Sequence, residues 1–167
     1  MDDMNISSKG LEGLIRSLDK VSGDVEQIAS RGVYVAAGAI ADEVKSGLQS
    51  LPVQNGKDGK PPYAPKGEQL RGVTSQQKQD LIDSMGIARF REENGVITTS
   101  IGFHGTGSTT SKKYPGGIPN RTLMRGVESG TSFRRKTPVI RPAVNRVKNR
   151  AVQLAAEKIT EELKKEL

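Results

Sequence analysis

The pair Asn94-Gly95 constrains the fold of this chain more than any other sequence feature. A type I′ turn needs positive φ at both central positions, so Asn-Gly between two alternating segments predicts a tight β-hairpin. One face of the hairpin is then mostly apolar and the other polar, as a hairpin with one covered face requires. We therefore predict a hairpin over residues 85–103. Its register pairs Glu92 with Ile97, Phe90 with Thr99, Ala88 with Ile101 and Gly86 with Phe103, and on the other face Arg91 with Thr98 and Arg89 with Ser100.

Before the hairpin, apolar residues recur every three or four positions over about seven helical turns. This spacing predicts a long central helix, which Asp24 and Gln27 would begin as a capping box and Pro52 would end. Glycines inside it each cost about 1 kcal/mol relative to alanine, and close packing would offset that cost. Either a plain core helix with incidental glycines or a helix that packs against another subunit fits the pattern. The glycines are Gly32, Gly38 and Gly47, and the stripe is Val25, Ala29, Val33, Ala36, Ile40, Val44, Leu48 and Leu51.

Two long segments, 53–79 and 104–120, are rich in glycine and proline and are predicted to be loops. Connections this long are usually either functional or disordered. The second contains Gly-Thr-Gly-Ser, but a phosphate-binding P-loop would also need Gly-Lys-Ser/Thr and a following helix, which are absent. Tyr63 in the first loop and Tyr114 in the second suit contact with a partner. We expect both loops to become ordered on assembly.

Further helices complete the predicted elements. Apolar spacing predicts an N-terminal helix over Lys9–Val21, within residues 1–23, and Asn120 is placed to cap a short helix over Arg121–Glu128. A final helix over Pro142–Leu167 carries one apolar face: Val144, Val147, Ala151, Ala155, Ile159 and Leu163. The fold class is therefore α+β: a long central helix and a C-terminal helix packed on an antiparallel β-sheet, in a single domain with long extended loops. Because only 34% of residues are hydrophobic and 4% aromatic, neighbouring subunits are expected to help complete the core.

The segment Val127–Ala143 joins three features in a specific order. A Glu-Ser-Gly-Thr turn comes first, then a basic connector, and then Pro-Val-Ile-Arg-Pro-Ala at the entry to the last helix. Pro142 suits the first helical position, although Arg141 before it cannot cap the helix. Together with Pro52-Val53 and the pattern Leu81-Ile82-Asp83-Ser84-Met85, this ending resembles the minor tail-component, or tail-completion, proteins of long-tailed bacteriophages, the lambdoid "gp-ten" type. The resemblance covers residues 25–167.

This resemblance implies a structural protein of a phage or prophage tail or neck. It would cap the head-proximal end of the tail tube and join the tail to the DNA-filled head, as one subunit of a ring that matches the sixfold symmetry of the tail. Its partners would be other tail and head-tail connector proteins, with passing contact with genomic DNA in the channel. It would be assembled in the host bacterial cytoplasm and carried in the virion.

The formal net charge of +7 lies in the last third of the chain, where residues 121–150 hold nine basic side chains against Glu128 alone. Such a patch indicates either nucleic acid or an acidic protein partner. These basic side chains could face DNA in the channel or grip acidic patches on an adjacent ring; we favour the second, because DNA must slide. The alternative function is a free-standing nucleic-acid-binding protein that uses this segment. The candidate partner-binding residues are Arg134, Arg135, Lys136, Arg141, Tyr63 and Tyr114.

The residue types give little support for catalysis. The chain has no cysteine, and its single histidine, His104, lies in a glycine-rich loop without an evident second ligand. Asp42 and Glu43 are neighbours and point about 100° apart on a helix. No catalytic triad, metal-ligand spacing or dinucleotide motif occurs, so we predict no enzyme, cofactor or metal, with a site built from scattered residues as the remaining alternative. No apolar run approaches the roughly 20 residues of a membrane span, and the acidic start Met1-Asp2-Asp3 is unlike a signal peptide.

Overall fold

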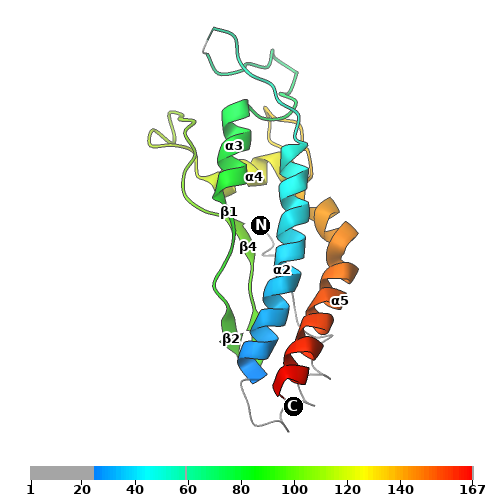
Figure 1. The fold of residues 1–167 in the computed structure, drawn as a ribbon. Coiled ribbons are helices and arrows are strands. Elements are labelled where there is room, and N and C mark those ends of the chain that lie inside the picture. Colours follow the sequence, from blue (N-terminus) through cyan, green and yellow to red (C-terminus); the bar gives the residue numbers. More distant parts are fainter. Residues whose placement is uncertain (1–24, 59, 167) are drawn as a thin grey trace. The chain divides into compact units, whose positions relative to one another are not determined.

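A computed structural model describes residues 25–58 and 60–166 (Figure 1). The predicted helix over Lys9–Val21 and the cap at Asp24 lie outside these residues. The elements are α2 (Val25–Gln49), α3 (Ser75–Ser84), β1 (Met85–Ile87), β2 (Arg91–Glu93), β3 (Val96–Thr98), β4 (Ile101–Phe103), α4 (Asn120–Ser129) and α5 (Ile140–Glu166). Four helices and two small antiparallel sheets in these residues confirm the α+β class.

The chain divides into two compact units, and α2 and α5 each contribute to both. The first unit contains residues 43–86 and 102–144, and the second contains 87–101 together with the described residues before 43 and after 144. The prediction of a single domain over residues 1–167 stays a prediction.

The long central helix is confirmed as α2, and its apolar stripe is buried. All stripe residues from Ala29 to Leu51 are buried, while Val25 at the first turn is half-buried. The helix ends at Gln49, three residues before Pro52, which cannot continue a helix. Periodicity therefore predicted both the element and its buried face.

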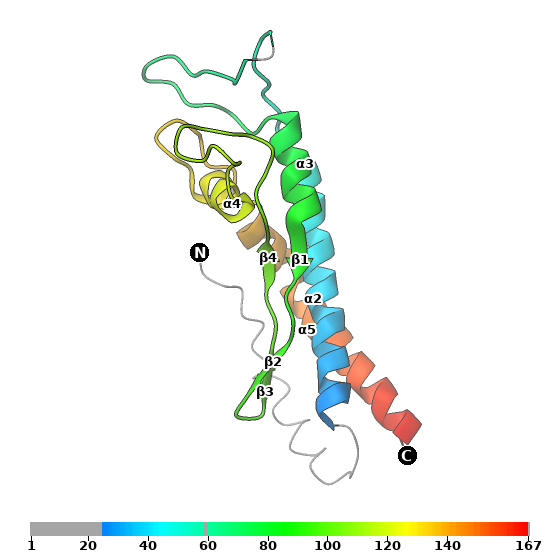
Figure 2. The same cartoon turned by 90° about the vertical axis from the view of Figure 1, so that its left-hand side faces the viewer.

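In the second unit, the hairpin turn lies where the sequence predicted it. Asn94 has φ 53° and Gly95 has φ 76°, as a type I′ turn requires. β2 and β3 lie side by side as an antiparallel pair (Figure 2). They pair in the predicted register, with Arg91 opposite Thr98 and Glu92 opposite Ile97. Ile97 is buried together with Ala29 and Val33 of α2, so this helix covers the apolar face of the hairpin.

Farther from the turn, the predicted register is wrong by one residue. Ala88 donates its backbone N–H to Ser100 O at 2.8 Å, so it lies opposite Ser100 and not Ile101. From Ala88 to Arg91 the first strand advances three residues, whereas its partner advances two, from Ser100 to Thr98. One extra residue of this kind is a β-bulge, which interrupts pairing and increases the local twist. β1 and β4 accordingly form a sheet separate from β2 and β3.

Within the second unit, the C-terminal helix packs closely on α2. A Cβ added to Gly32 of α2 would lie 2.6 Å from Ile159 Cγ1 and 3.1 Å from Ala155 O. This glycine therefore lets α5 approach closely, and within the second unit α2 lies between the hairpin and α5 (Figure 1). Gly47 plays the same part for Val139 in the first unit, whereas a Cβ on Gly38 would meet open space. Two of the three glycines thus serve packing inside the chain.

In the first unit, the loop predicted over 53–79 ends early, because α3 begins at Ser75. Thr74 and Gln77 form a capping box, in which the Thr74 side chain accepts from Gln77 N and the Gln77 side chain accepts from Thr74 N. This Thr-x-x-Gln signal was present in the sequence, but the glutamine-rich composition hid it. The base of the loop is closed by a bridge between Val53 and Val73, and α3 packs against α4.

Candidate functional site

The glutamate of the Glu-Ser-Gly-Thr turn caps the last helix. The Glu128 carboxylate accepts hydrogen bonds from the backbone N–H groups of Val139, Ile140 and Arg141 at 2.7, 2.9 and 3.0 Å. Because these N–H groups begin a helix, the negative charge also interacts favourably with the helix dipole. The predicted start at Pro142 is two residues late, and the cap that Arg141 cannot supply comes from Glu128 of α4.

The glycine and threonine of this turn shape the connector that follows. Gly130 has φ 80°, a conformation that favours glycine, and its N–H donates to Gly126 O. Thr131 N donates to Arg134 O at 2.9 Å, and Thr131 Oγ1 accepts from Arg134 N at 3.0 Å. The Glu-Ser-Gly-Thr turn therefore folds the chain tightly between α4 and α5.

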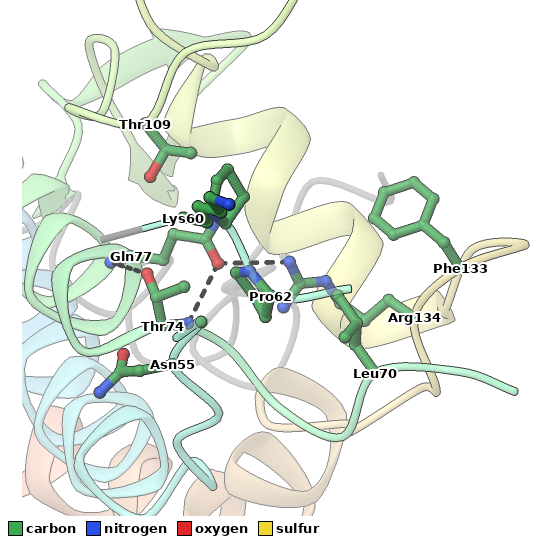
Figure 3. Close-up of a pocket in the computed structure, with 11 residues that line it drawn as sticks. Asn55, Lys60, Pro62, Leu70, Thr74, Gln77, Thr109, Phe133 and Arg134 are labelled. Carbon is green, nitrogen blue, oxygen red and sulfur yellow. Dashed lines mark hydrogen bonds between the residues drawn. The ribbon is translucent and has the colours of Figure 1, made fainter. Parts of the chain in front are cut away.

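Arg134 was expected to be a partner-binding residue at the surface, but it is buried. The residue is 6% exposed, and its side chain donates to Gly72 O. It also donates to Gln77 Oε1 at 3.2 Å (Figure 3). The same Gln77 oxygen accepts from Thr74 N, so Arg134 is part of the structure that begins α3. Burial lowers the pKa of the Arg134 guanidinium, which still stays charged at neutral pH.

The other basic candidates are exposed. Arg135 and Lys136 lie on the connector and line a cavity of about 450 Å³ with Gly130 and Thr131, and Arg141 is exposed on the first turn of α5. Arg135 N donates to Leu70 O at 2.9 Å, which fixes this part of the connector against the first loop. The structure thus leaves Arg135 and Lys136 exposed beside this cavity, whereas Arg134, which also lines it, is buried.

Aromatic side chains lie mostly outside the core. The predicted contact residue Tyr63 is 81% exposed, and Tyr114 is half-buried with the Lys113 ammonium 5.5 Å from its ring centroid. Phe133 is 57% exposed, beside the buried Arg134. In the second unit, Tyr34 and Phe90 are both exposed and make an edge-to-face contact, with ring centroids 6.2 Å apart. Of the six aromatic residues in the chain, Phe103 is the one that is buried.

A second cavity of about 450 Å³ lies beside Arg134 and was not predicted (Figure 3). Three separate segments build it: the first loop with the start of α3, the second loop at Thr109, and the connector at Phe133 and Arg134. Reciprocal backbone hydrogen bonds, Leu70 N to Phe133 O and Arg135 N to Leu70 O, join two of these segments. No local sequence signal marks such a site, because three separate segments build its walls and Arg134 lies 57 residues from Gln77 in the chain.

The second loop and α4 meet around Asp80 and Asn120. Asp80 Oδ2 accepts from Ser108 N at 3.0 Å and from Ser108 Oγ at 2.9 Å. Asn120 does not cap α4, as predicted; it is the first helical residue, it is buried, and its amide donates to His104 O at 3.0 Å. These bonds give the second loop a defined path at its base.

Within residues 25–58 and 60–166, no group of three or more His, Cys, Asp and Glu side chains is placed to hold a metal ion. None of the helices described is long and apolar enough to cross a membrane. Comparison with models of known protein families, with curated proteins and with solved structures found no match.

Proposed function

We propose that this protein is a structural component of a phage or prophage virion, located in the tail or neck. In this role it caps the head-proximal end of the tail tube and joins the tail to the head as one subunit of a ring. Its partners are copies of itself and other tail and connector proteins, and it works by surface complementarity. Assembly takes place in the host bacterial cytoplasm.

The observation that carries this proposal is the placement of the aromatic side chains. Tyr34, Tyr63, Phe90 and Phe133 are exposed, although aromatic residues dominate the energetics of protein cores and interfaces. Aromatic residues are also enriched at protein interfaces and among the side chains that carry most binding energy. Exposed aromatics on several segments suit a protein that is covered by neighbours on more than one side.

The basic connector supports the same proposal in a narrower way. Arg135, Lys136 and Arg141 are exposed and are free of the ion pairs that join other charged side chains in the described structure. We assign them to acidic patches on an adjacent ring, with DNA passing through the channel. Arg134 instead holds the connector in place.

The test removes the exposed charges together, as Arg135→Ser, Lys136→Ser and Arg141→Ser, in the phage or prophage that encodes the chain. Electron microscopy of the lysate is expected to show filled heads and tails that have not joined. Arg121→Ser with Arg125→Ser, two exposed changes on α4, is the matched control and is expected to give normal particles. Joined particles with altered DNA ejection would instead place these side chains in the channel, and normal particles in both cases would contradict the proposed role of the connector.

The alternative, a free-standing nucleic-acid-binding protein, is separated by a different measurement. Filter binding of double-stranded DNA across a salt series would then show a steep loss of affinity, with a slope of about 0.9 per phosphate neutralised. The proposed neck protein is expected to bind free DNA weakly and to form rings in light-scattering measurements when its partners are added. Tight, salt-dependent DNA binding by the isolated protein would favour the alternative.

A further inference from the structure

Arg134 is a buried cation without a carboxylate partner. Its two hydrogen-bond acceptors, Gly72 O and Gln77 Oε1, are both neutral, and among residues 25–58 and 60–166 it takes part in no ion pair. Buried arginines are usually paired with acids, because removing a charge from water is costly. A guanidinium has five N–H donors, so these two bonds leave part of its capacity unused.

The cavity beside Arg134 is suited to an acidic ligand (Figure 3). Its volume of about 450 Å³ falls within the range of roughly 300–1,000 Å³ typical of binding clefts. Lys60 adds a second positive charge, and no aspartate or glutamate is among the lining residues. Thr74 and Gln77 place the start of α3 in the same wall, where the helix dipole also favours a negative group.

Apolar side chains form the rest of the wall. Pro61, Pro62 and Leu70 line the cavity, and Phe133 lies at its edge with 57% of its surface exposed. A phosphate of the DNA backbone has no apolar group to place against such a wall. A peptide that carries an apolar side chain next to a carboxylate would use both kinds of surface.

We propose that this cavity binds an acidic segment of a partner protein. One carboxylate of the segment is held by Arg134 and Lys60, and an adjacent apolar side chain packs against Pro62 and Phe133. This assignment rests on the proposed assembly role and adds the chemistry of the partner to it. Its test uses the isolated protein, so that its failure is distinguishable from failure of the neck role, which is read from particle assembly.

The experiment is an NMR titration of the full chain with two capped peptides, GLEDFG and its uncharged counterpart GLQNFG. The acidic peptide is expected to shift the backbone signals of Thr74, Gln77 and Phe133, and the uncharged peptide to bind at least about tenfold more weakly. Lys60→Gln is expected to weaken binding of the acidic peptide about threefold to fivefold, the effect of a charge at the exposed edge of a site. Lys66→Gln, an exposed change in the same loop outside the cavity, is expected to leave binding unchanged.

Several results would overturn the proposal. Equal binding of the two peptides would show that the cavity recognises apolar side chains alone. Inorganic phosphate or a short DNA duplex that shifts the same signals at lower concentration than the acidic peptide would identify a phosphate site. Absence of shifts at these residues with millimolar acidic peptide, while the protein stays folded, would show that Arg134 is structural only.

Discussion

The Glu128 carboxylate accepts a hydrogen bond from the backbone N–H of Ile140, the first residue of α5, at 2.9 Å. Two neighbouring N–H groups donate to the same side chain, so α4 supplies the cap of a helix that begins eleven residues later. The Glu-Ser-Gly-Thr turn and the connector after it therefore have an internal role, which is to join α4 and α5. Only the exposed side chains of this connector are available to bind a partner.

Replacing Glu128 by Ala is expected to lower the free energy of unfolding by about 1–2 kcal/mol, because the first turn of α5 loses both its cap and a favourable charge. Urea unfolding followed by circular dichroism measures the change. Glu68→Ala removes the same charge at an exposed loop position and is expected to have almost no effect. Equal effects of the two substitutions would contradict the capping role.

Arg134→Ser is expected to destabilise the protein by about 1–3 kcal/mol, because Gly72 O and Gln77 Oε1 lose a buried donor. Arg135→Ser with Lys136→Ser removes two exposed charges and is expected to leave the melting temperature within about 1 °C, since surface changes seldom exceed 0.5 kcal/mol. A stable Arg134→Ser variant would show that this side chain is not needed for the fold.

Three glycines test the hairpin and the second loop. Gly95→Val is expected to cost about 1–2 kcal/mol, because a β-branched residue is strained at φ 76°. Gly107→Val is also expected to destabilise, because a Cβ there would lie 2.8 Å from Asp80 Oδ2 and 3.0 Å from Asn120 Oδ1. At Gly116, by contrast, a Cβ meets nothing within 4 Å and φ is not positive. The measurement is thermal melting. Equal melting temperatures for Gly107→Val and Gly116→Val would show that the second loop is not packed as described.

Two glycines of α2 are expected to respond in opposite directions to alanine. Gly32→Ala forces a Cβ within 2.6 Å of Ile159 Cγ1 and is expected to cost about 1–3 kcal/mol. Gly38→Ala meets open space and is expected to stabilise the isolated protein by about 0.5–1 kcal/mol, the gain from helix propensity. The measurement is a pair of chemical denaturation curves, and a Gly32→Ala variant as stable as Gly38→Ala would mean that α5 does not pack closely on Gly32.

Glu162 gives the second unit a dependence on acidic pH. Hydrogen bonds from Lys158, Lys165 and Arg31, in that order of effect, lower the pKa of this carboxyl to about 2. A depressed folded-state pKa means that its contribution is complete above the unfolded pKa of about 4.3 and is lost as the pH falls toward 2.

Comparison of wild type with Glu162→Gln tests this expectation. The difference in melting temperature is expected to be largest at neutral pH and to shrink between about pH 4.5 and pH 2. Glu157→Gln is the control. The Glu157 carboxylate lies 3.5 Å from the Arg150 guanidinium, and both side chains are more than half exposed. A difference that does not change across this range would show that the Glu162 charge does not stabilise the fold.

Local signals in the sequence predicted what neighbouring residues decide. The turn at Asn94-Gly95 was predicted correctly because positive φ is a property of those residues themselves. The buried stripe of α2 was predicted from spacing, because a helix places every third or fourth residue on one face. The capping box formed by Thr74 and Gln77 is equally local, although residues 53–79 were predicted to be a loop.

Only the tertiary structure decided which distant groups meet. The bulge before Arg91 changes the pairing of Ala88, and nothing in the pattern of alternation marks the extra residue. In the sequence, Arg134 is one more cation in a basic run. In the fold it is buried against Gln77 and Gly72, which are 57 and 62 residues away in the chain. The sequence by itself determined the turn, the long helices and the excess of positive charge. The fold decided which of those charges remain at the surface, because burial depends on segments that the chain brings together from far apart.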